Sequence, residues 1–325
     1  MGNSVVAVLC AGAVTLTAGL VLAGDNTCFS PPSVLASFVS GQEIPESVTA
    51  DKQGNLYVSV GNTIRRREPG GQFSVFATLP LPINALGVKV GPDGCVYNAS
   101  TSLSAVPGAF VWKICGANSV EVFTELDPAG GPNDLAFDDH GDLFVTDPVL
   151  GRIWRVDQTG NAQVFAQHPR LLGDASDPAL VFRPVGVNGI AFQPQQRALY
   201  VSNTDQGSIL RIDLRAANHT PTLFARSERL RGADGIAFDR EGTLFVAVNA
   251  LDSLVTVSRN GQLRVALQGG LLDAPSSIVF GSNFHDQHEL FLMSSAFSRT
   301  LGFQSGTPQP ALLKARITTP GLPLL

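Results

Sequence analysis

A seven-residue stretch recurs along the chain and limits the folds that the chain can adopt. Its clearest copy is 233–239 (ADGIAFD), and related copies lie at 44–51 (IPESVTAD), 131–138 (GPNDLAFD) and 186–193 (GVNGIAFQ). In each copy an oxygen-bearing side chain stands five residues before the residue that opens a turn. These side chains are Glu46, Asn133, Asn188 and Asp234. Equivalent positions of a repeat converge in space when the repeats are arranged around an axis.

The copies belong to a longer unit that occurs six times at a spacing of about 40 to 55 residues, a period typical of β-propellers. Each unit reads as four short strands. The second strands, such as 142–146 (DLFVT) and 243–247 (TLFVA), are rich in β-branched and aromatic residues. Glycine-containing turns, such as 139–141 (DHG) and 240–242 (REG), precede them and supply the left-handed residue of a tight hairpin.

The two ends of the chain complement each other. One strand precedes the first unit, and the last unit lacks its outer strand. Residues 34–39 (VLASFV) resemble an outer strand without a blade, whereas 311–317 (ALLKARI) resemble a third strand without an outer one. We therefore expect the N-terminal strand to complete the last blade and close the ring, which removes exposed sheet edges. The predicted fold is an all-β, six-bladed β-propeller that forms a single domain over 25–325.

The N-terminus reads as a targeting segment. Residues 5–23 are largely apolar and uncharged, and 21–23 (VLA) resemble a cleavage site, so 1–24 are predicted to be a cleaved signal peptide. A single-pass anchor is the alternative, because the apolar run approaches spanning length. Sequons at Asn98 and Asn218 predict glycosylation and agree with secretion.

The net charge limits the kinds of partner that the protein can bind. A net charge of −5 argues against a nucleic-acid surface, which needs clustered Lys and Arg. We expect a secreted monomer that acts on a small molecule and, once the signal is cleaved, has no membrane contact.

Three of the four cysteines lie outside the predicted signal peptide. Cys95 opens the second strand of the second unit, and Cys115 ends its third strand. These positions face each other in an antiparallel hairpin, so we predict a disulfide between them. Cys28 is then free or pairs elsewhere.

The four recurring side chains combine two carboxylates with two amide carbonyls. An all-oxygen set suits a hard divalent cation, Ca²⁺ first and then Mg²⁺ or Mn²⁺. Zn²⁺ is less favoured because no His or Cys joins the set. Turn capping explains any single Asn or Asp equally well, but it does not explain Glu46 or all four residues in one register. Leu86 and Ser276 occupy this register in the second and sixth units and are predicted to line the site.

With these motifs in place, residues 33–318 resemble the senescence marker protein/gluconolactonase family, which has relatives among the diisopropylfluorophosphatases, paraoxonases and strictosidine synthases. The family pattern has a Glu in the first blade, Asn in Asn-Asp and Asn-Gly-Ile-Ala contexts, and Asp in Ala-Asp-Gly. The resemblance implies that Glu46, Asn133, Asn188 and Asp234 hold one divalent metal, usually calcium. It also implies that Asp234 acts as base or nucleophile.

Such a site has a defined chemistry. A cation polarises a lactone or ester carbonyl and stabilises the oxyanion that forms, and Asp234, beside Glu46, could deprotonate water or attack directly. The longer loops are expected to surround the substrate, although simple packing explains each of their residues about as well. The predicted pocket residues are Asp147, Phe182, Arg183, Asn203, Asn249, Phe297, Arg299 and Phe303.

The leading prediction is therefore a secreted, metal-dependent hydrolase of a lactone or a related ester. A natural-product cyclase on the same scaffold is the alternative, either forming carbon–carbon bonds or templating a pericyclic ring closure. A non-catalytic binding propeller with a structural cation is the third reading. Fold alone does not choose among them. The motifs of serine hydrolases, zinc proteases, phosphate-binding loops and Cys-x-x-Cys redox sites are absent from the sequence.

Overall fold

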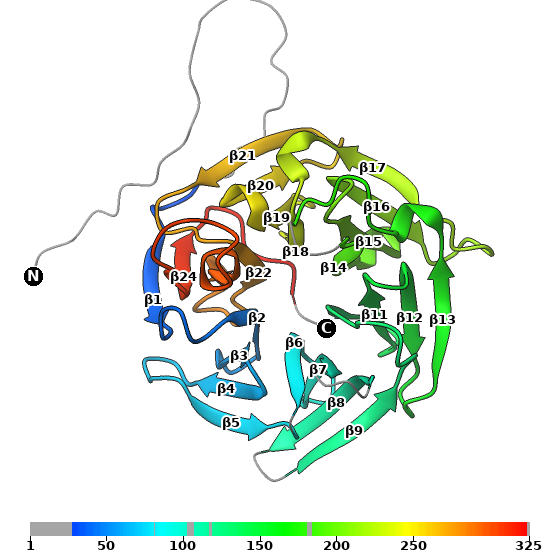
Figure 1. The fold of residues 1–325 in the computed structure, drawn as a ribbon, viewed down its shortest axis with the longest axis horizontal. Coiled ribbons are helices and arrows are strands. Elements are labelled where there is room, and N and C mark those ends of the chain that lie inside the picture. The colour runs from blue at the N-terminus through cyan, green and yellow to red at the C-terminus, as the bar shows by residue number, and fades with distance from the viewer. Residues whose placement is uncertain (1–27, 81, 103–106, 117–118, 181–183, 324–325) are drawn as a thin grey trace, which may run out of the picture.

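The computed structural model describes residues 28–80, 82–102, 107–116, 119–180 and 184–323. Six four-stranded antiparallel sheets surround a central axis, as Figure 1 shows in a view along that axis. The predicted all-β, six-bladed propeller is confirmed. The predicted signal peptide, 1–24, lies outside the described residues. In the described part of the chain, no helix has the length and apolar character needed to cross a membrane.

Five of the sheets are simple meanders from the axis outward, and the sixth takes its outermost strand from the N-terminal end of the described chain. In that order the strands are β2 (Pro45–Ala50), β3 (Leu56–Val60), β4 (Thr63–Arg67) and β5 (Ser74–Thr78); β6 (Ile83–Val90), β7 (Val96–Ser102), β8 (Ala109–Gly116) and β9 (Ser119–Glu125); β10 (Leu135–Phe137), β11 (Leu143–Asp147), β12 (Arg152–Val156) and β13 (Ala162–Gln167); β14 (Val187–Gln193), β15 (Ala198–Asn203), β16 (Ser208–Asp213) and β17 (Thr222–Arg226); β18 (Ala233–Phe238), β19 (Leu244–Val248), β20 (Ser253–Val257) and β21 (Leu263–Gln268); and β22 (Pro275–Phe280), β23 (Glu289–Ser294), β24 (Ala311–Arg316) and β1 (Ser33–Ser37). Short helical segments are η1 (Pro169–Leu171), η2 (Pro194–Gln196), η3 (Glu228–Leu230), η4 (Asn249–Leu251) and α1 (Phe297–Thr300).

The turns between first and second strands follow from the Asp-x-x-Gly pattern. In the third sheet, Asp138 Oδ1 accepts hydrogen bonds from the backbone N–H groups of His140 (2.9 Å) and Asp142 (3.0 Å). Gly141 has a φ of 83°, which a side chain would make unfavourable. The corresponding glycines of three other sheets, Gly54, Gly94 and Gly242, have φ values of 83°, 79° and 80°. The predicted left-handed turn glycines are confirmed.

The ring closes through the two ends of the chain. β1 pairs with β24 in antiparallel register, with Ser33 opposite Lys314 and Ser37 opposite Ala311. Figure 1 shows the blue N-terminal strand lying outside the red C-terminal one. The predicted closure, in which the N-terminal strand completes the last blade, is confirmed.

The hydrophobic core lies between neighbouring sheets. One cluster joins Tyr200 and Ile209 of the fourth sheet to Phe238 and Val246 of the fifth. The Tyr200 ring packs edge-on against Phe238, with 5.0 Å between the ring centroids. Each sheet thus buries both faces against its neighbours, which is why second strands such as Leu244–Val248 are buried throughout.

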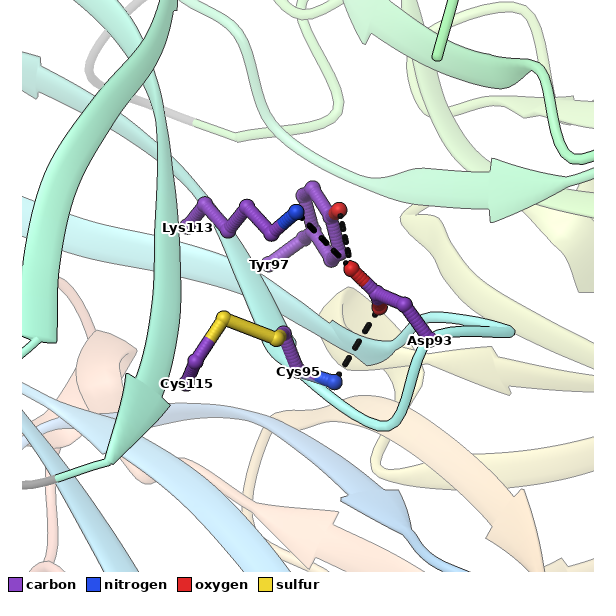
Figure 2. The surroundings of a disulfide bond; sticks show 5 residues. All are labelled: Asp93, Cys95, Tyr97, Lys113 and Cys115. Atoms are coloured by element: carbon purple, nitrogen blue, oxygen red, sulfur yellow. Dashed lines mark hydrogen bonds and ion pairs between the residues drawn. A yellow bond between two sulfur atoms is a disulfide. The ribbon is translucent and has the colours of Figure 1, made fainter.

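The predicted disulfide is present in the second sheet. Val96 of β7 pairs with Ile114 of β8, so Cys95 and Cys115 lie opposite each other, with Cα atoms 4.4 Å apart. Figure 2 shows the bond between the two strands. Cys28, which the sequence left open, is not a free thiol.

A polar cluster adjoins the disulfide (Figure 2). The Asp93 carboxylate accepts hydrogen bonds from the Cys95 N–H (3.1 Å) and the Tyr97 hydroxyl (3.0 Å), and it forms an ion pair with Lys113 (2.9 Å). Burial alone would raise the pKa of Asp93, but Lys113 and the two hydrogen bonds hold it below its ordinary value. The disulfide and this cluster both stabilise the hairpin of β7 and β8.

Removal of the disulfide is expected to destabilise the propeller. The bond closes a segment with a sequence separation of 20 residues, for which the loss of unfolded-state entropy is worth about 3 kcal/mol. We expect a Cys95→Ser/Cys115→Ser variant to unfold at a lower temperature and urea concentration than the wild type. Equal unfolding midpoints, measured by circular dichroism, would show that strand pairing alone holds this hairpin.

Candidate functional site

The recurring side chains occupy one structural register in all six sheets. In each sheet, one residue of the first strand pairs with a residue near the middle of the second strand, and the recurring side chain stands two positions before it. In the fifth sheet, Ile236 pairs with Val246, and Asp234 stands two positions before Ile236. The corresponding pairs are Val48 with Val58, Val88 with Asn98, Leu135 with Val145, Ile190 with Val201 and Ile278 with Leu292. The six equivalent residues are Glu46, Leu86, Asn133, Asn188, Asp234 and Ser276.

The backbone at this register is fixed by hydrogen bonds from sheet to sheet. Five of the six carbonyl oxygens accept a hydrogen bond from the preceding sheet. The donors are Ser276 Oγ to Glu46 (2.6 Å), Ser59 Oγ to Leu86 (2.6 Å), Gly87 N to Asn133 (2.7 Å), Thr146 Oγ1 to Asn188 (2.5 Å) and Ser202 Oγ to Asp234 (2.8 Å). The six positions therefore form one ring around the tunnel.

Glycine after the register residue permits this close approach. A Cβ on Gly189 would lie 2.2 Å from the Asp234 carbonyl oxygen, and one on Gly235 would lie 2.6 Å from that of Ser276. The Asn-Gly and Asp-Gly dipeptides of the repeat are thus required by contact between sheets. Here these dipeptides do not form the tight turns in which they usually occur.

Asn188 presents an unused amide oxygen. Its side chain is 3% exposed, and its Nδ2 donates to Thr204 Oγ1 at 3.0 Å. The Thr204 hydroxyl in turn donates to the Ala233 carbonyl at 2.8 Å, so it can only accept from Asn188, and the Nδ2 end of the amide faces Thr204. Asn188 Oδ1 is buried and accepts no hydrogen bond from the described residues. A buried acceptor in this state is costly unless a ligand fills it.

Asp234 is buried beside a second carboxylate. Its side chain is 5% exposed, and its Oδ2 accepts a hydrogen bond from Asn249 Nδ2 at 3.0 Å. Burial, and then the negative charges of Glu46 and Asp134, raise the pKa of Asp234 well above its ordinary value. Glu46 and Asp234 therefore lie close enough for their charges to interact strongly.

Asp134 is a third acidic residue of the site, and the sequence reasoning missed it. Its Oδ1 accepts from the Leu135 N–H (2.8 Å), and its Oδ2 accepts from the Ile190 N–H of the next sheet (3.1 Å). Desolvation raises the pKa of Asp134, against the opposing effect of Lys89. The repeat contains the signal that could have found it, because this position is Gly or Ser in the other five units.

The donor set fits a hard cation. Glu46 and Asp234 offer carboxylates, Asn188 offers an unpartnered amide oxygen, and Asn133 stands in the same register beside Asp134. No three His, Cys, Asp or Glu side chains of the described residues form a metal-binding group. A cation at this site would therefore need the amide oxygens as well, which suits Ca²⁺ better than Zn²⁺.

Two residues predicted for the substrate pocket, Asp147 and Asn203, hold the backbone of loops, and their contact with a substrate stays a prediction. Asp147 is fully buried, and its Oδ1 accepts from the N–H groups of Gly131 (3.0 Å) and Leu150 (3.1 Å). Asn203 Nδ2 donates to the carbonyls of Arg170 and Leu172, both at 2.9 Å. Polar residues at strand ends serve here as loop anchors.

One positively charged residue predicted for the pocket is held in ion pairs. Arg299 of α1 pairs with Asp252, at 3.0 Å, and with Asp273. Phe297 is buried in an apolar cluster, and Phe303 borders a small cavity. Phe182 and Arg183 lie outside the described residues. Among the strand-end residues predicted for the pocket, only Asn249 contacts a candidate ligand.

The two sequons differ in accessibility. Asn98 is fully buried, and its Nδ2 donates to the Gly87 carbonyl at 2.8 Å, so a glycan at Asn98 does not fit the folded protein. Asn218 is exposed in the turn between β16 and β17. Glycosylation at Asn218 remains a prediction.

The ionised form of Asp234 is expected to lower the stability of the folded protein when no cation is bound. An acid whose pKa is raised in the folded state binds its proton more tightly there than in the unfolded chain. Its ionisation is therefore destabilising at pH values above the folded-state pKa. This loss disappears as pH falls below the ordinary value near 4.

We expect Asp234→Asn to stabilise the cation-free protein at pH 7, because the amide carries no charge that burial and Glu46 would disfavour. Thermal unfolding in excess chelator measures the effect. Asp138→Asn is the matched control, because that carboxylate accepts backbone N–H groups in a distant turn and its loss should destabilise. A lower melting temperature for Asp234→Asn would contradict the burial argument.

Comparisons with known proteins identify the family and the fold. The sequence model of the family described as the SMP-30/gluconolactonase/LRE-like region matches residues 91–296, a segment that contains Asn133, Asn188 and Asp234 but not Glu46. The gluconolactonase of Zymomonas mobilis subsp. mobilis is 28% identical over 249 residues, which cover 67% of this chain and 67% of that protein.

Solved structures share the fold. A gluconolactonase from Xanthomonas campestris superposes with a TM-score of 0.63 at 18% identity, over 90% of each chain. Regucalcin, a calcium-binding protein from Agrobacterium tumefaciens, superposes with a TM-score of 0.60 at 18% identity, over 86% of this chain and 92% of its own. The family match covers well over half of the sequence, and the chain therefore belongs to the SMP-30/gluconolactonase/LRE-like family.

Proposed function

We propose that this protein is a metal-dependent hydrolase of a lactone, with a divalent cation held by Glu46, Asn188 and Asp234 and with Asn133 at the fourth position. Family membership and the likeness to a gluconolactonase support lactone hydrolysis. The buried, unpartnered Asn188 Oδ1 beside two interacting carboxylates carries the metal proposal. Ca²⁺ is the favoured ion, with Mg²⁺ and Mn²⁺ next, because these ions prefer oxygen ligands.

The side chains of the site have distinct tasks in this proposal. A cation bound here would polarise the substrate carbonyl and stabilise negative charge on its oxygen. Asn249 holds one oxygen of Asp234, which fixes the direction of the carboxylate. Thr204 fixes the amide of Asn188 in the same way. Asp234 would then act as the base that removes a proton from water or as the nucleophile.

The central test combines chelation with substitution at Asp234. We expect the purified protein to hydrolyse a simple lactone, to lose this activity in chelator and to regain it with Ca²⁺. Asp234→Asn should lower kcat/KM by at least 100-fold, as expected for loss of a general base or nucleophile, and circular dichroism should show an intact fold. Asp138→Asn is again the control, and its kcat/KM should stay close to that of the wild type.

Several outcomes would contradict the proposal. Full activity in metal-free protein would exclude a catalytic metal. Calcium binding without hydrolysis of any lactone or ester would favour the alternatives, a cyclase on the same scaffold or a binding propeller with a structural cation. No contact described above favours either alternative over hydrolysis.

Substitution of Thr204, which is hydrogen-bonded to the proposed ligand Asn188, tests the proposed metal site separately. We expect Thr204→Val to weaken Ca²⁺ binding by about 10- to 100-fold, the usual effect of losing a hydrogen bond that orients a metal ligand. Isothermal titration calorimetry measures the affinity. Thr256→Val is the matched control, because Thr256 is 2% exposed on β20 and its hydroxyl points to the Arg264 carbonyl. Unchanged affinity for Thr204→Val would exclude the orienting role.

We also propose that the protein is secreted and works as a monomer. The Cys95–Cys115 disulfide supports an oxidising compartment, and the exposed Asn218 sequon is compatible with glycosylation. Mass spectrometry of protein from the culture medium would identify both the mature N-terminus and a glycan on Asn218.

A further inference from the structure

An apolar cluster lies at the mouth of the tunnel where the candidate ligands stand. It consists of Leu180, Val185, Ala274 and Phe297, with Ile44 and Ala250 packed against it. These residues come from three loops, η4 and α1. Ile44 stands two residues before Glu46, Val185 three before Asn188 and Ala274 two before Ser276. The cluster therefore adjoins the ring of candidate ligands from several sides.

A small cavity opens within this cluster. It has a volume of ≈ 90 Å³ and is lined by Ala179, Leu180, Ala250, Phe297 and Phe303, together with Ser298 and Gln304. Ala250 directly follows Asn249, whose side chain is hydrogen-bonded to Asp234 at 3.0 Å. The cavity is thus one residue away from a partner of the proposed catalytic carboxylate.

Among the described residues, the cavity lining carries no charged side chain. Ser298 and Gln304 are its polar members, and both are neutral. The neighbouring Arg299 is engaged by Asp252 and Asp273. Those carboxylates also accept backbone hydrogen bonds, from Ala274 N at 2.8 Å and Gln309 N at 2.9 Å respectively. An anionic substituent would lose hydration here, and the described lining offers a heavily hydroxylated one few partners beyond Ser298 and the unpartnered Gln304 Oε1.

We infer that this cavity binds an uncharged alkyl substituent of the lactone, so that the enzyme prefers short-chain alkyl lactones to polyhydroxylated sugar lactones. The inference rests on the proposed lactonase function. The size of the cavity supports a short chain, since an apolar cavity of ~150 Å³ holds a benzene molecule. Each methylene that enters the cavity should raise kcat/KM about fourfold, which corresponds to ~0.8 kcal/mol.

The test is a homologous substrate series with one ring size. We would measure kcat/KM for γ-butyrolactone, γ-valerolactone, γ-hexalactone and γ-heptalactone, with glucono-δ-lactone for comparison. The expected result is a two- to fourfold rise per added carbon across the series, with glucono-δ-lactone below γ-heptalactone. A flat or falling series, or a preference for glucono-δ-lactone, would overturn the inference.

Substitution of the cavity wall separates this effect from general hydrophobicity. Phe303→Ser should lower kcat/KM for γ-heptalactone by about tenfold more than for γ-butyrolactone. Leu301→Ser is the matched control, since Leu301 lies two residues away, is 53% exposed and does not line the cavity. An equal effect of both variants on all substrates would also overturn the inference.

The outcomes distinguish this inference from the function on which it depends. If every lactone is inert, the proposed hydrolase function fails. If all lactones are hydrolysed without dependence on chain length, the hydrolase function stands and the alkyl site is excluded.

Discussion

The pairing of β1 with β24 is the interaction on which the rest of this structure depends. It joins the two ends of the chain within one sheet and so fixes six sheets around a common axis. Only in a closed ring does the last sheet precede the first, so that Ser276 can donate to the Glu46 carbonyl as Thr146 and Ser202 donate to the carbonyls of Asn188 and Asp234. Residues almost 190 positions apart in the sequence, such as Glu46 and Asp234, become neighbours for this reason.

The site shows the physical cost of this convergence. The ring buries Asp234 near Glu46 and Asp134, and both of their charges make the ionisation of Asp234 less favourable. Such an arrangement destabilises a fold unless a positive group compensates it, and polar groups that remain unsatisfied in a stable protein commonly mark a functional site. The unpartnered oxygen of Asn188 belongs to the same arrangement, because Thr204 holds the other end of its amide.

Sequence reasoning succeeded where a pattern repeats and failed where a residue acts alone. The spacing of the units predicted the six sheets, the ring closure, the Cys95–Cys115 bridge and the common register. It did not reveal the loop and ion-pair partners of Asp147, Asn203 and Arg299, because an isolated polar residue looks the same whether it faces a substrate or a loop. Their partners, such as Gly131 for Asp147 and Asp252 for Arg299, lie at distances along the chain that no local pattern reveals.

What the sequence by itself determined is the periodic part of the protein. Alternating strands, Asp-x-x-Gly turns and oxygen-bearing side chains at equivalent positions specify a closed propeller with a polar ring at one mouth. Only the tertiary structure decided which oxygens are left without partners, which carboxylates interact and which arginine is neutralised. These properties depend on side-chain contacts between segments far apart in the sequence, and such contacts exist only after the sheets have packed.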